Sequence, residues 1–66
     1  MNAHNPDEVQ HNVAEVLYHL GLGYEMEGQY EEAAESYRRA LMRDPLLSAA
    51  RHHLEELQKV HSAGMI

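Results

Sequence analysis

The sequence predicts an all-α fold, in which an antiparallel helix-turn-helix hairpin is followed by a third helix, all within one domain over residues 1–66. Apolar residues recur at every third or fourth position in three segments, which is the period of an amphipathic helix. No segment alternates apolar and polar residues as a half-buried strand does. The connections are very short, so consecutive helices should run antiparallel. We expect helices at about residues 6–27, 30–43 and 46–61.

The first expected helix begins at Pro6, with Asn5 as its N-cap. Asp7 and Glu8 follow in the first turn, where carboxylates favour the positive end of the helix dipole. The apolar stripe of this helix consists of Val9, Val13, Val16, Leu17, Leu20 and Tyr24. We expect Gly28 to end the helix, because glycine readily adopts the left-handed conformation that closes one.

The second expected helix carries glutamates early and arginines late, an order that suits the dipole. Glu35 and Arg39 are spaced for an ion pair across one turn. Its expected buried face consists of Ala33, Tyr37, Ala40 and Leu41. Pro45 disfavours helical geometry at the residue before it, so this helix should stop near Arg43.

The third expected helix opens at Leu46 or Leu47 and should fray before Gly64. One side of it gathers apolar residues at helical spacing, with His61 at the end of the row. The row consists of Leu47, Ala50, Leu54, Leu57, Val60 and His61.

The composition limits the classes of partner. A chain of 66 residues buries only about 60% of its unfolded surface, so its own core is marginal. Eleven acidic and five basic side chains give a net charge of −6, which argues against nucleic acid and anionic membranes. The first ten residues lack the basic flank and apolar run of a signal peptide or membrane anchor, so we expect a cytoplasmic protein.

Small and large residues also follow a fixed order through the first two helices. The order is Leu17-x2-Leu20-Gly21-x2-Tyr24, then Gly28-x-Tyr30-x2-Ala33-x3-Tyr37-x2-Ala40-Leu41, then Asp44-Pro45. This pattern resembles the tetratricopeptide repeat family, with Leu17 in place of the family's tryptophan and Tyr37 in place of its phenylalanine. The resemblance covers one full repeat, about Ala14 to Leu47, and implies the helical hairpin of an α-α superhelix.

The resemblance further implies that the third helix starts a second repeat, with Leu54 as the signature leucine. Arg51, Glu55 and Gln58 stand where the family has a tryptophan, a small residue and an aromatic residue. Polar side chains at these positions indicate a helix that faces water, as a C-terminal capping helix does.

A single repeat predicts self-association, because such units usually need about three copies to build a stable core. Val9 and Val13 precede the repeat and extend past the expected reach of the second helix. We expect a homo-oligomer, with a symmetric dimer favoured, that covers these valines, Val16 and part of the apolar side of the third helix. A marginal monomer covered by its own third helix is the alternative.

Gly23 is not explained by the repeat signature. In mid-helix it costs about 1 kcal/mol relative to alanine. It therefore predicts a close backbone approach, either by the third helix or by a second subunit.

In this family the inner face of each repeat's first helix lines a groove that binds peptide segments of partner proteins. The corresponding residues, called the groove face below, are Glu15, Tyr18, His19, Leu22, Glu25 and Met26, continued on the third helix by Ala49, His52, His53 and Glu56. Its aromatic, apolar and carboxylate groups predict a partner segment with apolar anchors and a basic residue. The lysines and asparagines with which some members clamp a C-terminal carboxylate are absent. An ordinary exposed helix face, or a contact between subunits, is the alternative interpretation.

Metal binding is a further hypothesis, because the chain has six histidines. His11, Glu15 and His19 share one helix face, and Glu8 precedes His11 by the spacing used in carboxylate-bridged sites. A usable site needs three or four converging ligands, so we expect neither a metal nor another cofactor.

Catalysis is not expected. No serine lies on a strand-to-helix elbow, carboxylate pairs lie on solvent-facing helical positions, and three short helices leave no room for a substrate cavity. The sequence thus predicts a protein-protein interaction module that binds a partner segment, self-associates, or both. A homo-oligomeric building block without a separate ligand is the alternative, and a histidine and carboxylate metal binder is the third hypothesis.

Overall fold

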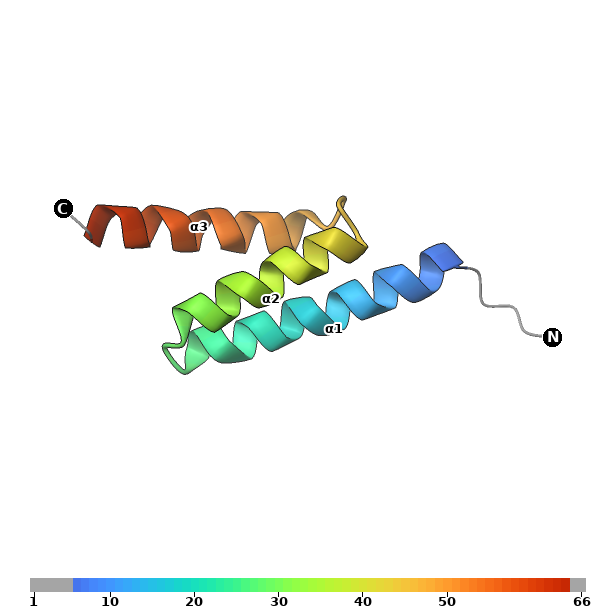
Figure 1. The fold of residues 1–66 in the computed structure, drawn as a ribbon, viewed down its shortest axis with the longest axis horizontal. Helices are drawn as coiled ribbons and strands as arrows, with labels where there is room; N and C mark the ends of the chain where they lie inside the picture. The colour runs from blue at the N-terminus through green and yellow to red at the C-terminus, as the bar shows by residue number, and fades with distance from the viewer. Residues whose placement is uncertain (1–5, 65–66) are drawn as a thin grey trace.

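The computed structural model describes residues 6–64, with the side chains of Val9 and of residues 11–60. These residues form three helices, α1 (Pro6–Met26), α2 (Tyr30–Arg43) and α3 (Ser48–Gly64), and no strand. α1 and α2 are an antiparallel hairpin, and α3 lies along the other side of α2 (Figure 1). The all-α class and the hairpin with a third helix are confirmed. Within the described part, no helix is long and apolar enough to cross a membrane.

The turn between α1 and α2 is closed by Gly28, as predicted. Its φ of 78° is the left-handed conformation that a Cβ disfavours. The Gly28 N–H donates to the Glu25 carbonyl at 3.0 Å, and the Gln29 N–H donates to the Tyr24 carbonyl at 2.9 Å. These two bonds form a Schellman motif, which satisfies the last carbonyls of α1. α1 therefore ends at Met26, one residue before the expected boundary.

The turn between α2 and α3 is organised by Asp44. Its backbone is extended, with φ −141° and ψ 92°, as expected before Pro45, so α2 ends at Arg43. The Asp44 carboxylate accepts the Leu46 N–H at 3.1 Å, and the Asp44 carbonyl accepts the Leu47 N–H at 3.1 Å. Both N–H groups are thus held in a turn. For this reason α3 begins at Ser48, not at Leu46, and it continues to Gly64 without the expected fraying.

The core is small and lies mainly between α1 and α2. Its buried apolar residues are Ala14, Ala33, Tyr37, Ala40, Ala50 and Leu57. Gly21 is also buried, and a Cβ placed there would lie 2.5 Å from the ring of Tyr37. The helices therefore cross over small residues, with the Tyr37 ring filling the space at Gly21. Ser36 is a buried residue that the pattern did not predict.

The apolar stripe predicted for α1 is only partly a core stripe. Leu17 and Tyr24 pack against the core, but Val16 is 68% exposed and Leu20 47% exposed. Tyr30, one of the large residues of the repeat pattern, is also exposed. The physical reason is that, in a stack, a repeat of this type buries that side of its first helix on a neighbouring unit, whereas the described residues contain a single matched repeat.

Two further expectations fail on the outer helices. Val60 is 65% exposed and does not belong to the buried side of α3. Gly23 is exposed, and a Cβ placed there would meet nothing within 4 Å, so α3 does not approach it. Approach by a second subunit stays a prediction. Asn5 lies outside the described residues, as do the side chains of Asp7, Glu8 and His61.

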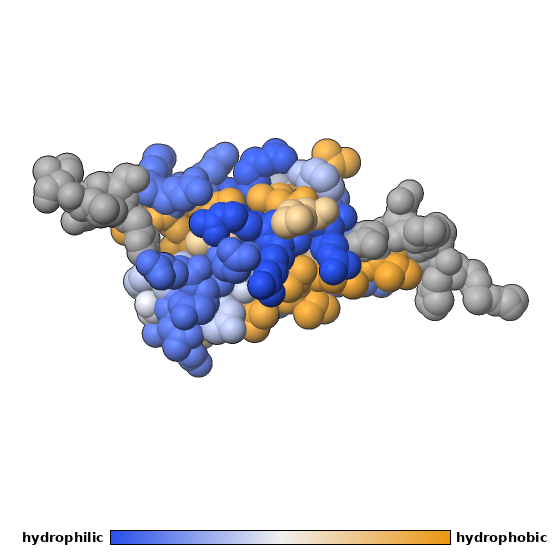
Figure 2. Space-filling model, in the orientation of Figure 1, coloured by the Kyte–Doolittle hydropathy of each residue, from blue (hydrophilic) through white to orange (hydrophobic). Residues whose placement is uncertain are grey.

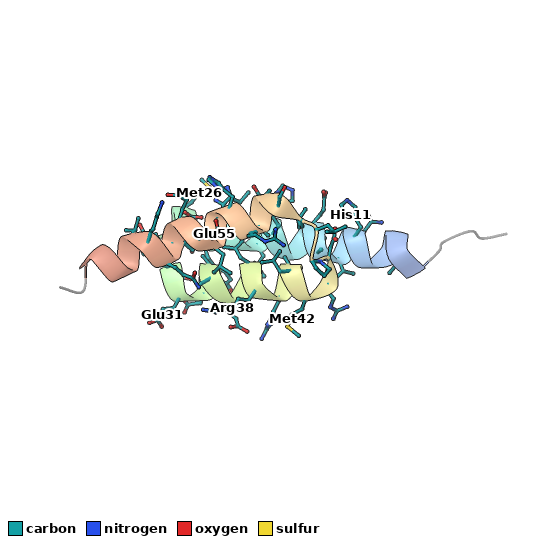
Figure 3. All side chains as sticks on the ribbon, turned by 90° about the horizontal axis from the view of Figure 1, so that it is seen from above. His11, Met26, Glu31, Arg38, Met42 and Glu55 are labelled. Carbon is teal, nitrogen blue, oxygen red and sulfur yellow. The ribbon has the colours of Figure 1, made fainter. Side chains whose placement is uncertain are left out.

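The polar surface follows the predicted order of charges. Arg39 Nε donates to Glu35 Oε2 at 3.3 Å, which is the expected pair one turn apart, and Arg38 Nη1 donates to Glu35 Oε1 at 3.4 Å. Arg51, Glu55 and Gln58 are exposed, as a capping helix requires, and Figure 3 shows Glu55 projecting from α3.

Candidate interaction surface

The groove face is formed where α1 and α3 approach each other over α2. The ring of Tyr18 on α1 meets the ring of His53 on α3 edge-on, with centroids 5.6 Å apart. Tyr37 on α2 lies against both, at 5.9 Å from Tyr18 and 5.5 Å from His53. Three rings from three helices thus form one aromatic cluster, at separations typical of attractive ring pairs.

Glu25 is the polar centre of this cluster. Its Oε1 accepts a hydrogen bond of 2.6 Å from the Tyr37 hydroxyl and lies 3.5 Å from Nδ1 of His53. Burial raises the pKa of the Tyr37 hydroxyl above its usual range, and the Glu25 carboxylate raises it further. The hydroxyl therefore remains a donor at any physiological pH, and it fixes the orientation of Glu25. The Glu25 side chain is 30% exposed, so a partner can still reach it.

Two imidazoles extend the cluster to its edges. The ring of His19 lies 5.2 Å from Tyr18, and the ring of His52 lies 5.9 Å from His53. Both histidines are exposed, whereas Tyr18, Leu22 and His53 are half-buried. The structure therefore brings most of the predicted groove residues together, with the half-buried ones as a floor and the exposed ones as a rim.

The remaining groove residues lie farther from this cluster. Met26 is 87% exposed at the C-terminal end of α1, and Glu56 is exposed on α3. Figure 3 shows Met26 on the side of the molecule opposite to Arg38 and Met42 of α2. Glu25 and Glu56 together line a surface hollow of about 370 Å³, which continues the groove face toward the end of α3.

The charge of the groove face is negative. Glu15, Glu25 and Glu56 supply carboxylates, and no lysine or arginine is among its residues. Glu15 is paired with His11, whose Nε2 lies 3.3 Å from Glu15 Oε2. A cationic group would therefore meet favourable potential at Glu25 and Glu56.

His11 forms a second polar contact that the sequence did not predict. Its Nδ1 lies 2.9 Å from Asp44 Oδ2, which ties α1 to the turn between α2 and α3. The hydrogen bond with Asp44 raises the pKa of His11, and the same bond lowers the pKa of Asp44. The two carboxylates contact opposite nitrogens of the ring, so they do not converge on one point. Among the described residues, no group of three such side chains is placed to hold a metal ion.

Another hollow lies between α2 and α3, on the side away from the groove face. It has a volume of about 450 Å³ and is lined by Tyr30, Glu31, Ala34, Glu35, Arg38, Leu57 and Gln58. This hollow is a surface depression, which arises because α3 contacts α2 less extensively than α1 does (Figure 1).

Tyr37 is the residue of this cluster that the sequence interpretation missed, because it was assigned to the hairpin core alone. The signal was the replacement of a phenylalanine by tyrosine at a buried position, since a buried hydroxyl requires a hydrogen-bond partner. Asp44 had no such signal, because its partner His11 is 33 residues away in the sequence.

Comparison with known proteins gives a family. A model of the tetratricopeptide repeat matches residues 14–47, which are 34 of the 66 residues. The match covers the hairpin from Ala14 onward and leaves α3 outside, as expected for one repeat with a capping helix. Searches of curated proteins and of solved structures gave no match.

Proposed function

Because the chain belongs to the tetratricopeptide repeat family, whose members serve as protein-protein interaction modules, we propose that its groove face binds a segment of a partner protein. The segment carries apolar residues and at least one basic side chain. Repeats of this family are typically non-catalytic, so binding is the whole of the proposed activity.

The position of Glu25 supports the proposal that the partner segment carries a basic side chain. Its carboxylate is oriented by the Tyr37 hydroxyl at 2.6 Å and is partly shielded from water by the aromatic cluster. An oriented carboxylate in a shielded site attracts a lysine or arginine more strongly than one on an open helix. Leu22 and Met26 are the apolar contacts on the same helix face.

A matched pair of peptides tests this proposal. One fluorescein-labelled peptide carries leucines and lysines, and the other carries glutamates in place of the lysines. We expect fluorescence anisotropy to saturate with the lysine peptide only. Saturation by both peptides, or by neither, would contradict the proposal.

Two neighbouring residues of α3 provide the matched variants. Glu56 is on the groove face, whereas Glu55 is on the outer side of α3, and both are exposed. We expect Glu56→Lys to weaken binding of the lysine peptide about tenfold, the effect of 1.4 kcal/mol. Glu55→Lys makes the same charge change and should leave the affinity nearly unaltered. Equal losses would mean that only the net charge of the protein matters.

A second candidate function is that of a homo-oligomeric building block. The observation that favours it is the exposure of Val9 and Val16 on α1, at 43% and 68%. Gly23 and Val13 belong to the same predicted self-association surface.

A further inference from the structure

His53 differs from the other histidines of the groove face because it is held against the carboxylate at the centre of that face. His53 is half-buried, whereas His19 and His52 are exposed. Its Nδ1 lies 3.5 Å from Glu25 Oε1, and its ring packs against two tyrosine rings of the aromatic cluster at 5.6 and 5.5 Å. A change in the charge of His53 therefore acts on the carboxylate to which the proposed function assigns the partner's basic side chain.

Titratable groups surround His53 on all three helices. They are Tyr18 and Glu25 on α1, Tyr37 on α2 and, on α3 itself, the neighbouring His52 and, one turn further on, Glu56. Burial keeps the Tyr37 hydroxyl protonated. Arg38 of α2 lies on the opposite side of the molecule from Met26 (Figure 3), and hydrophilic side chains cover much of that opposite side (Figure 2). Among the described residues, Glu25 is the carboxylate in contact with His53.

We propose that the proton of His53 and the basic side chain of the partner segment compete for Glu25, so that the groove face binds the segment at neutral pH and releases it at mildly acidic pH. Histidine is the side chain that ordinarily changes its charge between pH 5 and 8. A protonated ring at 3.5 Å from Oε1 forms an ion pair with the carboxylate. The partner's lysine or arginine then meets a neutralised carboxylate and a like charge beside it. The inference rests on the proposed function, since it concerns the same carboxylate.

The direction of the pH dependence follows from this competition. A neutral ring leaves the charge of Glu25 free to attract a cation, while the Tyr37 hydroxyl still orients the carboxylate through its hydrogen bond of 2.6 Å. A bound cation disfavours the proton on His53, so binding of the segment releases protons, and by linkage added protons weaken the binding. The affinity is therefore highest above the pH range in which His53 is protonated, and it falls as the pH decreases through that range.

Fluorescence anisotropy with the lysine peptide at two pH values tests the competition. The label is a rhodamine in place of fluorescein, because rhodamine emission does not change in this pH range. We expect the Kd to be about tenfold higher at pH 5.5 than at pH 7.5, a typical size for the coupling between two ligands. Equal affinities at the two pH values would overturn this inference only and leave the proposed function intact. Absence of binding at both pH values would overturn the proposed function together with this inference.

His53→Gln and His52→Gln are matched variants, because each removes one imidazole from the same turn of α3. The His52 ring is exposed and lies 5.9 Å from the His53 ring, whereas His53 contacts Glu25. We expect His53→Gln to lose most of the pH dependence and His52→Gln to keep it. Equal reductions in the two variants would overturn the inference, because the pH dependence would then come from the total charge of the protein. Circular dichroism verifies that both variants keep the helicity of the unaltered chain.

Calorimetry of the unaltered chain gives a readout that needs no variant. An N-acetylated lysine peptide is titrated in two buffers that differ in ionisation enthalpy, and the difference in heat gives the number of protons exchanged on binding. We expect net release of protons at pH 6.5 and almost none at pH 8.5, where histidine is ordinarily neutral. Uptake of protons at pH 6.5, or no exchange, would overturn the inference even if the affinity changed with pH.

Discussion

The two outer helices, α1 and α3, differ in the polarity of the surface that each exposes to the solvent. α1 exposes Val16 and Leu20, at 68% and 47%, on the side where a preceding repeat would pack. α3 exposes Arg51, Glu55 and Gln58 on the side where a following helix would pack. Both helices bury one face on α2, so the difference lies in the outward faces alone. The outward face of α3 is therefore polar and that of α1 apolar, as expected if the α1 side takes a partner.

We expect the largest change in the mass of the protein in solution when the outer side of α3 is made apolar, like that of α1. In the triple variant Arg51→Trp, Glu55→Ala and Gln58→Tyr, the outer side of α3 carries the residue types of the family signature. A chain with an apolar face at each end can form open assemblies, so we expect a mass above that of two chains that grows with concentration. Sedimentation velocity measures it.

The control for that variant keeps each position polar, with Arg51→Lys, Glu55→Asp and Gln58→Asn. It should sediment as the unaltered chain does. An apolar triple variant that sediments the same way would show that polarity is not what closes the α3 end.

Truncating one leucine on each outer helix compares covered and uncovered faces. Leu57 is 6% exposed between α3 and α2, whereas Leu20 is 47% exposed on α1. We expect Leu57→Ala to lower the free energy of unfolding by about 2–5 kcal/mol. Leu20→Ala should lower it by about 1 kcal/mol in dilute solution, because half of that side chain is already in water. Urea unfolding followed by circular dichroism gives both values, and equal losses would contradict the difference.

Gly21 and Gly23 allow a similar comparison within α1, because Gly21 is buried and Gly23 is exposed. An alanine Cβ at residue 21 would lie 2.5 Å from the Tyr37 ring, whereas at residue 23 it would meet nothing within 4 Å. Gly21→Ala should destabilise the fold, since overpacking costs about 1–3 kcal/mol and exceeds the propensity gain. Gly23→Ala should stabilise the single chain by about 1 kcal/mol. Thermal unfolding at low concentration measures both, and the same sign for the two variants would be inconsistent with this geometry.

The smallest effect concerns the contact that ties α1 to the turn between α2 and α3. His11 has a raised pKa and Asp44 a lowered one, through their mutual hydrogen bond. The His11 contribution is complete below its ordinary pKa of 6.5 and is lost as the pH rises through the raised value. The Asp44 contribution is lost at the acidic end, as the pH falls through its lowered pKa. The contact is therefore strongest between these two values.

Carbon-13 chemical shifts of residues 11–15 can detect this change. We expect slightly lower helicity of that segment at pH 8 than at pH 6 and no such difference in His11→Asn. His19→Asn serves as the control, because its ring contacts Tyr18 and not Asp44, and it should keep the difference. A pH difference that survives in His11→Asn would assign the effect to another group.

The sequence predicted the fold well because helical period and turn chemistry are local. Gly28 and Pro45 determined where two helices end, and both are read from single positions. The start of α3 was wrong because the Asp44 side chain and carbonyl capture the next two N–H groups. The spacing of apolar residues, from which the start of α3 was predicted, contains no signal for these hydrogen bonds.

The groove face was predicted through the family resemblance, and the structure brings Tyr18, Glu25 and His53 together. The exposure of Leu20 was not predicted, because an apolar stripe has the same period whether or not a neighbour covers it. Whether such a stripe is covered depends on which units pack beside the hairpin, and that is a property of the assembly.

Methyl NMR of a valine-labelled chain tests most directly whether the apolar side of α1 becomes covered. The chain has four valines, of which Val9, Val13 and Val16 lie on α1 and Val60 lies on α3, 65% exposed. On increasing the protein concentration, we expect the methyl signals of the three α1 valines to shift together while those of Val60 stay in place. Four sets of signals that do not move, or a Val60 shift as large as the others, would contradict the account.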